Sequence, residues 1–171
     1  MAEEIMEEEV LEEDAQKVKF MTFRTGKEYF GISINYVNEI IQMQPITSIP
    51  EVEDYIKGLI NLRGKIIPVI DVRLRFKMEP IEYTDRTCII VIDVKSVTIG
   101  LIVEKIAEVD TVMDDDIVPP PKLGKKDSEQ SKYVYGLART GNGMKLLLDP
   151  EKLIKDEDLQ AISDLQEEEQ E

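Results

Sequence analysis

The chain has 171 residues, of which 42% are apolar, so it can bury a hydrophobic core as one domain or as two small coupled domains. Its formal net charge of −15 comes from the two ends, because residues 1–14 and 156–171 each hold eight acidic residues and no basic residue, whereas residues 15–155 hold 20 acidic and 21 basic residues. A neutral body with acidic ends excludes nucleic-acid binding, which depends on neutralising phosphates with Lys and Arg. We interpret residues 1–16 and 156–171 as solvated acidic tails, the second of them helical.

The sequence contains no histidine and a single cysteine, which limits the chemistry available to it. Histidine-based metal sites and Ser-His or Cys-His catalytic pairs are excluded, and we expect neither a metal nor a cofactor. Cys88 lies inside the apolar run TCIIVIDV, which predicts a small buried side chain and no internal disulfide. The acidic N-terminus does not resemble a secretion signal, and no apolar run approaches the roughly 20 residues that span a bilayer, so we expect a cytoplasmic protein without membrane insertion.

The first predicted elements are a β-hairpin and a short helical turn. Apolar residues alternate in KVKFMTFR, and Thr25-Gly26-Lys27 then forms a turn into the second strand, EYFGIS. In residues 34–41, INYVNEII, the apolar side chains follow the spacing i, i+3, i+6 and i+7, which predicts one helical turn running into a strand.

A second hairpin is predicted in residues 55–76, YIKGLINLRGKIIPVIDVRLRF, where apolar runs flank the basic turn LRGK. The glycine of this turn can take a positive φ, so residues 58–62 and 65–72 are expected to pair as strands. Pro68 has no N–H to donate, so the second strand is expected to lie at a sheet edge or to carry a bulge at Pro68. Asp71 is expected to cap the short helical segment that follows.

Residues 86–109 contain two long β-branched runs, RTCIIVIDV and SVTIGLIVEKIAEV, separated by a turn near residues 93–96, and both are predicted to be long strands. Asp114–Asp116 lack the alternating spacing of a calcium-binding loop and are interpreted as a turn. The Pro- and Lys-rich segment from Pro119 to Lys132 predicts a mobile loop.

The C-terminal part is predicted to contain a last hairpin and one or more helices. The runs YVYGLART and GMKLLLD form strands around Gly141-Asn142-Gly143, which is a strong turn signal. Asp149-Pro150 predicts a helix start, with Asp as the cap and Pro in the first turn. Four apolar residues then predict a helical face that docks on the body: Leu153, Leu159, Ile162 and Leu165.

The two halves of the chain show a weak internal repeat. Residues 58–71 and 136–149 both begin with Gly-Leu, contain a strand, a turn and a strand, and end with Asp, and a tyrosine lies three residues before each glycine. The offset between the halves grows from 69 to 78, which indicates that the second half gained nine residues in the Pro-rich loop. A glycine and a glutamate eight residues apart also recur at the smaller offset: Gly31 and Glu39, then Gly100 and Glu108.

Each half offers about five short strands, which predicts an all-β fold, with short helices, built from two small five-stranded barrels. We place the boundary between the subdomains near residue 84, so that residues 17–84 and 85–155 form the two barrels of one domain, residues 17–155. Barrels of this size have thin cores, so we expect them to pack on each other around a shared core. Their junction is expected to form a groove in which a partner's helix could lie.

Three blocks, YFGISINYVNEI, GLINLRGKIIPVIDVR and IVIDVKSVTIGLIVEKIAEV, strongly resemble the CheW family of chemotaxis coupling proteins, and the resemblance covers residues 17–155. It implies two five-stranded SH3-like barrels around a shared core and no catalytic activity. Members of this family bridge the cytoplasmic tips of transmembrane chemoreceptors and the regulatory domain of the histidine kinase CheA, a domain that itself looks like CheW. The acidic extensions and the longer Lys-rich loop, residues 122–132, depart from the family's usual pattern.

The resemblance also implies which residues contact these partners. Arg63 in NLRG and Glu39 in YVNEI would shape the receptor-facing surface, because an Arg fork can hold a carboxylate of a neighbouring segment. The kinase contact would use the strand that carries Ile66 and Ile67, against the matching barrel of CheA. The apolar members of the receptor groove are equally compatible with positions in the core. The implied receptor-binding set is Ile34, Val37, Glu39, Ile40, Arg63, Ile99, Leu101 and Val103.

Two other functions remain open at this point. An enzyme could use paired carboxylates such as Asp71 and Asp93 as acid and base, although capping of the adjacent turns explains both residues more simply. The same fold could also serve as another scaffold of a two-component pathway, or as a fragment of a CheV-like or CheA-like protein. The chain argues against the fragment, because no receiver-like run and no kinase motif accompany the barrels.

Overall fold

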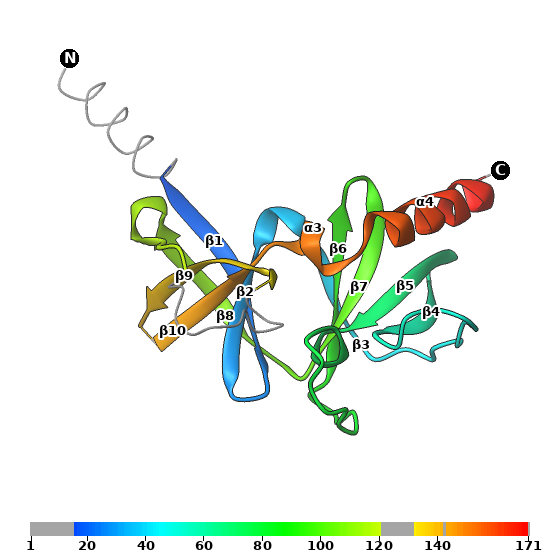
Figure 1. Ribbon diagram of the computed structural model, residues 1–171, viewed down its shortest axis with the longest axis horizontal. Coiled ribbons are helices and arrows are strands. Elements are labelled where there is room, and N and C mark those ends of the chain that lie inside the picture. The colour runs from blue at the N-terminus through cyan, green and yellow to red at the C-terminus, as the bar shows by residue number, and fades with distance from the viewer. Residues whose placement is uncertain (1–15, 121–131, 142, 171) are drawn as a thin grey trace, which may run out of the picture.

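The computed structural model describes residues 16–120, 132–141 and 143–170, and it contains two five-stranded β-sheets that lie side by side (Figure 1). The strand order is β8-β1-β2-β10-β9 in the first sheet and β3-β6-β7-β5-β4 in the second. The strands are β1 (Lys17–Thr25), β2 (Glu28–Ser33), β3 (Val37–Gln42), β4 (Ile56–Leu62), β5 (Lys65–Asp71), β6 (Cys88–Val94), β7 (Val97–Val103), β8 (Lys105–Met113), β9 (Val134–Thr140) and β10 (Gly143–Leu148). The helices are the short 3-10 turns η1 (Ile34–Tyr36) and η2 (Asp114–Asp116), and α2 (Val72–Arg75), α3 (Pro150–Leu153) and α4 (Asp156–Gln170).

The sheets are not formed by consecutive halves of the chain. The first sheet takes β1 and β2 from the first half and β8, β9 and β10 from the second, and the second sheet takes the other five strands. The boundary predicted near residue 84 is therefore wrong as a division between the sheets. The long strand predicted across residues 96–109 breaks at Glu104 into β7, which stays in the second sheet, and β8, which crosses to pair with β1. The turn η1 makes the corresponding crossing between β2 and β3.

The internal repeat is visible in matching contacts. The carbonyl of Tyr55 accepts a hydrogen bond from the N–H of Asp71, and the carbonyl of Tyr133 accepts one from the N–H of Asp149, both at 2.8 Å. Both sheets also share one plan, in which three antiparallel pairings accompany one parallel pairing. The two copies of the repeat therefore exchange strands with each other. The parallel pairings include equivalent positions: Val69 with Gly100, and Leu147 with Gly31.

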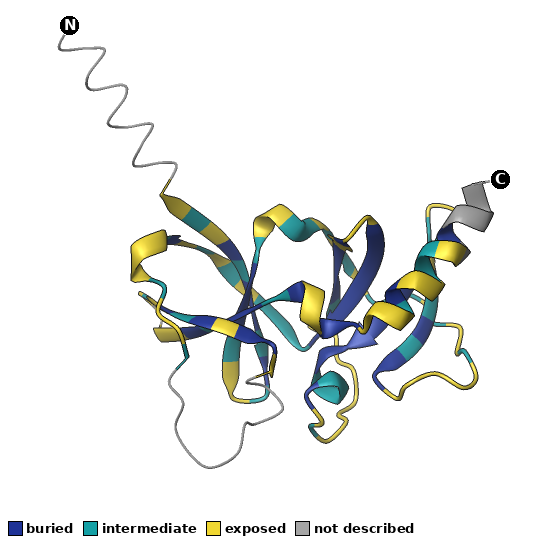
Figure 2. Cartoon of the chain, turned by 45° about the horizontal axis from the view of Figure 1, so that its top comes forward, coloured by how far each residue is buried: buried dark blue, intermediate teal, exposed yellow. Residues whose placement is uncertain are grey.

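The buried apolar residues form one cluster that joins the two sheets and two smaller clusters that each lie within one sheet. The largest draws residues from both sheets and contains the rings of Phe30, Phe76 and Tyr133, with centroid distances of 5.1 and 5.6 Å along that series. The guanidinium of Arg75 lies between Tyr55 and Tyr133, the two tyrosines of the repeat, at 4.3 and 4.8 Å from their ring centroids. The predicted shared core between two small barrels is thereby confirmed, and Figure 2 shows the buried residues along its strands. The smaller clusters are Phe20, Val112, Ala138 and Leu147 in the first sheet, and Ile60, Ile67, Val69, Ile89, Val91 and Ile102 in the second.

Most local predictions hold, but the one for Pro68 does not. The hairpin predicted around LRGK is β4 and β5, and the helical turn predicted to run into a strand is η1 and β3. Pro68 lies in an interior strand, because β5 is flanked by β4 and β7, and the register shift of the hairpin lies between Ile56 and Gly58 instead. The missing N–H is tolerated because the pairing of β5 with β7 begins only at Val69.

The acidic C-terminal segment is a helix that docks on the body, as predicted. Leu159 of α4 is 5% exposed and belongs to the shared core. Cys88 is half-buried against the same core, and this burial raises the pKa of its thiol above the ordinary value. The predicted N-terminal tail, residues 121–131 of the predicted loop and the turn residue Asn142 lie outside the described residues.

Both predicted aspartate caps are present, and they differ in burial. Asp71 is 6% exposed; its Oδ1 accepts from the N–H of Leu74 at 3.3 Å and its Oδ2 from the hydroxyl of Tyr83 at 2.8 Å. Asp149 caps α3 with one bond, from the N–H of Glu151 at 3.0 Å.

We expect Asp71→Ala to lower the free energy of unfolding by about 2 kcal/mol, because it removes a cap and also the hydrogen bond from the hydroxyl of Tyr83. Asp149→Ala is expected to cost about 1 kcal/mol, the value of a cap alone. Urea unfolding of both variants measures the difference. Equal losses would contradict a separate contribution from the Tyr83 bond.

Candidate docking surface

The turn between β4 and β5 is a tight two-residue hairpin that presents Arg63 at its tip. Arg63 and Gly64 have φ values of 53° and 85°, and two positive φ values in succession are typical of the type I′ turns that match the twist of paired strands. The side-chain oxygen of Asn61 accepts a hydrogen bond from the N–H of Gly64 at 2.9 Å. The hairpin geometry predicted from LRGK is thus present, with an additional constraint from Asn61.

Arg63 is paired with Glu39 across the two edges of the second sheet. The Nη2 group of Arg63 donates to Oε2 of Glu39, and the two side chains are 68% and 34% exposed. The hydrogen bond to Glu39, and then its charge, raise the pKa of Arg63 above its ordinary value. Because β3 and β4 are the opposite edge strands of this sheet, the pair connects edges that share no backbone pairing with each other.

An open depression of about 310 Å³ lies beside this ion pair. Its floor includes Ile67, which is buried, and its rim is polar. On the rim, the hydroxyl of Thr98 donates to Oδ1 of Asp93 at 2.8 Å and accepts from the ammonium of Lys65 at 2.8 Å. An apolar floor with a fixed polar rim suits the insertion of a side chain from a protein partner. The lining residues are Asn38, Glu39, Leu62, Arg63, Lys65, Ile67, Val91, Asp93 and Thr98.

The predicted receptor-groove residues differ in burial and in the face to which they point. Arg63 and Glu39 form the ion pair at the depression. Ile34 and Ile40 are exposed, at 37% and 40%, whereas Val37 is half-buried and packs against the shared core. Ile40 follows Glu39 directly in β3, so their side chains point to opposite faces of the strand.

The prediction that Ile99, Leu101 and Val103 line an open groove is wrong. They are 0%, 0% and 2% exposed and belong to the shared core. The reason is the position of β7, which lies in the middle of the second sheet and is buried at all seven positions. A strand that is covered on both faces has no solvent-facing set of side chains.

The predicted kinase-contacting pair is also divided by burial. Ile67 is 1% exposed, lies in the apolar cluster of the second sheet and lines the floor of the depression, so a kinase contact through its side chain would have to enter the depression. Ile66 is half-buried next to α4, and its carbonyl accepts a hydrogen bond from the side chain of Gln166 at 3.3 Å. The contact through Ile66 stays a prediction.

The paired carboxylates considered for acid–base chemistry do not form a pair. Asp71 is opposite Ile102 of β7 and is engaged as a cap, while Asp93 is opposite Thr98 of the same strand and bonds to its hydroxyl. Four residues along a strand correspond to roughly 13 Å. Within the described part of the chain, no three or more His, Cys, Asp and Glu side chains gather in a way that could hold a metal ion.

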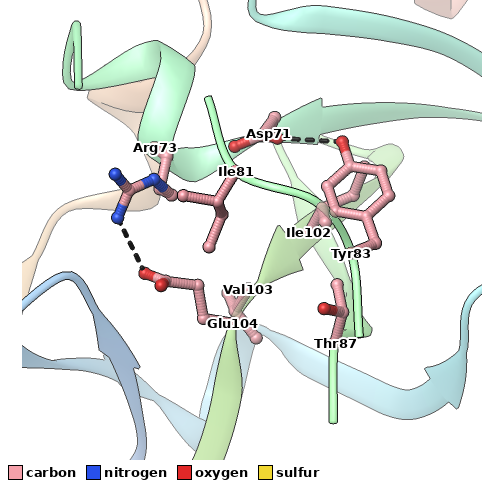
Figure 3. A pocket seen from close by; sticks show the side chains of 8 residues that line it. All are labelled: Asp71, Arg73, Ile81, Tyr83, Thr87, Ile102, Val103 and Glu104. Carbon is pink, nitrogen blue, oxygen red and sulfur yellow. Dashed lines mark hydrogen bonds and ion pairs between the residues drawn. The ribbon is translucent and has the colours of Figure 1, made fainter. Parts of the chain in front are cut away.

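A second, small pocket marks the crossing between the sheets and is structural (Figure 3). Its volume is about 10 Å³, enough for roughly one water molecule. The guanidinium of Arg73 meets Glu104 at 3.3 Å, and the side chains of the two residues are 14% and 17% exposed. Glu104 also accepts from the N–H of Gly26 in the first sheet, so it ties α2 and that hairpin turn together where the chain leaves β7.

Sequence reasoning missed four polar residues of the depression: Asn38, Lys65, Asp93 and Thr98. Lys65 could have been recognised, because it follows the NLRG turn directly. Asp93 and Thr98 are directly opposite each other beside the β6–β7 turn, so their proximity follows from that hairpin. Their position near Arg63 does not, because it requires β5 to pair with β7.

No helix among the described residues combines the length and the apolar character needed to cross a membrane.

Comparisons with known proteins agree with this fold. Residues 19–158 match the model of the CheW-like domain. The chemotaxis protein CheW of Bacillus subtilis is 36% identical over 136 residues, which cover 80% of this chain and 85% of that protein. CheW of Klebsiella aerogenes is 32% identical over 147 residues, covering 86% and 87%. The crystal structure of the scaffolding protein TtCheW from Thermoanaerobacter tengcongensis is similar with a TM-score of 0.73 and 34% identity, covering 81% of this chain and 92% of that one. The chain therefore belongs to the CheW family of chemotaxis adaptor proteins.

Proposed function

We propose that this non-enzymatic adaptor couples the cytoplasmic tips of transmembrane chemoreceptors to the regulatory domain of the histidine kinase CheA, and that it works in the cytoplasm, attached to the membrane only through receptor arrays. The observation that carries the proposal is the Arg63–Glu39 pair, which fixes a tight hairpin against the opposite sheet edge beside an open depression. Such a surface positions side chains for binding and performs no bond chemistry.

The receptor contact is proposed for Arg63 and Glu39 at the depression and for the apolar side chains next to them in the chain, which are the exposed Ile34, the half-buried Val37 and, on the other face of β3, the exposed Ile40. A receptor tip is helical, and an apolar helix face needs exposed aliphatic groups to pack on. Ile34 and Ile40 supply such groups near the edge strand β3. The ion pair fixes the position of the hairpin relative to that strand, so it acts on the shape of the surface.

The kinase contact is proposed for the hairpin of β4 and β5, at the surface that includes Ile66. The strand β4 is an edge of the second sheet, and an edge strand offers main-chain groups that another barrel can pair with. A partner that itself resembles this fold would meet it barrel end to barrel end.

A pull-down tests this function directly. Full-length protein is immobilised and offered the isolated regulatory domain of CheA and, separately, a receptor cytoplasmic fragment. We expect both to be retained, and retention of each to be lost when an excess of free protein is added. Retention of neither would refute the proposal. Retention of the receptor fragment without the kinase domain would favour the alternative, another CheW-like scaffold of a two-component pathway.

A further inference from the structure

The seam between β5 and β7 is open at one end and is filled by a side chain from α4. The two strands run parallel and pair only from Val69 to Asp71, against Gly100 to Ile102. Towards their N-terminal ends they are no longer paired with each other, although each keeps its antiparallel neighbour. The amide of Gln166, which is 9% exposed, lies in this part of the seam.

Gln166 makes the hydrogen bonds that a neighbouring strand would make. Its Nε2 donates to the carbonyl of Thr98 at 2.9 Å and to that of Ile66 at 3.3 Å, and its Oε1 accepts from the N–H of Thr98 at 3.3 Å. In a β-strand the N–H and C=O of one residue point to the same side, so the main chain of Thr98 faces the seam. A side-chain amide offers a carbonyl acceptor and an N–H donor, as a peptide unit of a strand does, and one further N–H donor.

Besides Gln166, few of the α4 side chains that the structure describes contact the body. Leu159 is buried and Ile162 is half-buried against the shared core. The first turn is tied by Asp156 to Lys95 at 3.1 Å and by Asp158 to the hydroxyl of Tyr55 at 3.1 Å. The ion pair with Lys95 is exposed and contributes little. Displacing the end of α4 that carries Gln166 therefore leaves both sheets intact.

We propose that the β5–β7 seam is a binding surface for an edge strand of the kinase's regulatory barrel, and that α4 occupies this surface in the free protein and competes with the kinase for it. The inference rests on the proposed kinase contact and specifies its main-chain groups, those of Ile66 and Thr98. An edge strand that displaces the Gln166 amide can offer the N–H and C=O groups of its free side to the N–H and C=O groups of Thr98. The hydroxyl of Thr98 bonds to Lys65 and Asp93, and all three residues line the depression. A strand bound at the main chain of Thr98 would therefore also affect the side chains that line the depression.

The test compares Gln166→Ala with Gln160→Ala, both in the full-length chain. Gln160 lies on the exposed side of α4, and its described hydrogen bond stays within the helix, to Asp164 at 3.0 Å, so it is a matched control. We expect Gln166→Ala to accelerate hydrogen exchange at the amide of Thr98 roughly tenfold and to tighten binding of the CheA regulatory domain roughly threefold or more, because the competing helix is held less firmly. Gln160→Ala is expected to change neither quantity.

Two outcomes separate this inference from the function on which it rests. Equal or weaker kinase binding by Gln166→Ala, with normal binding by the unaltered protein and faster exchange at Thr98, would overturn the competition and leave the adaptor function standing. Absence of kinase binding by the unaltered protein and by both variants would refute the kinase contact itself, and the inference with it.

Discussion

Arg63→Asp is expected to abolish receptor control of the kinase in a reconstituted assay, lowering the kinase activation that depends on this protein roughly tenfold or more. The substitution places a carboxylate opposite Glu39, so the hairpin is repelled from the edge strand to which it is now bonded. The midpoint of thermal unfolding is expected to stay nearly unchanged, because the side chain of Arg63 is 68% exposed and contributes little to the core.

Two further variants test whether kinase control depends on the position of the hairpin or only on the charge of the surface. Arg86→Asp reverses another exposed arginine, at the turn before β6, and is expected to leave kinase control intact. The exchange Glu39→Arg with Arg63→Glu restores an ion pair of opposite polarity and is expected to recover part of the activity. Normal coupling by Arg63→Asp alone would refute the shaping role of the pair.

Gly58→Ala is expected to lower the free energy of unfolding by about 4 kcal/mol, a large part of the stability of a domain this size. Gly58 has a φ of 146°, and a β-carbon added there would lie 2.2 Å from the carbonyl oxygen of Thr47. That oxygen accepts from the N–H of Leu59 at 2.8 Å, so the new methyl group would push apart two segments that are bonded to each other.

Two other glycines separate the cost of the positive φ at Gly58 from the cost of its steric clash with Thr47. A β-carbon at Gly141 meets nothing within 4 Å and Gly141 has no positive φ, so Gly141→Ala is expected to be within about 0.5 kcal/mol of the unaltered protein. Gly64 has open space but a φ of 85°, so Gly64→Ala is expected to cost about 1 kcal/mol. Urea unfolding should rank the losses Gly141, Gly64, Gly58. A Gly58→Ala variant as stable as Gly141→Ala would contradict the described contact with Thr47.

The hairpins, caps and turns could be predicted because their signals are local. The Gly in LRGK permits the reversal, and Asp71 and Asp149 stand directly before short helical segments. The repeat predicts the same strands twice, but it does not specify whether strands pair within one copy or between copies. The crossing at Glu104 decides this, and neither Gly nor Pro marks it in the sequence.

The contact between Arg63 and Glu39 is present as predicted, although β3 and the β4–β5 hairpin lie at opposite edges of the second sheet. The site predictions that depended on burial were wrong. The β7 residues predicted for the groove are apolar, and the sequence pattern of a strand that lines a groove is the same as that of a strand in the core. Only the order of the strands shows that β7 is interior. The burial of Gln166 has no signal at all in the sequence, because it depends on two strands that separate beneath α4.

The most direct test of the adaptor function is whether this protein joins its two partners at the same time. Receptor-containing vesicles are sedimented with CheA, in the presence and absence of the full-length protein, and the kinase in the pellet is measured. We expect CheA to sediment with the receptors only when the protein is added, and Arg63→Asp to prevent this. CheA that sediments equally without the protein, or that stays in the supernatant with it, would contradict the adaptor function.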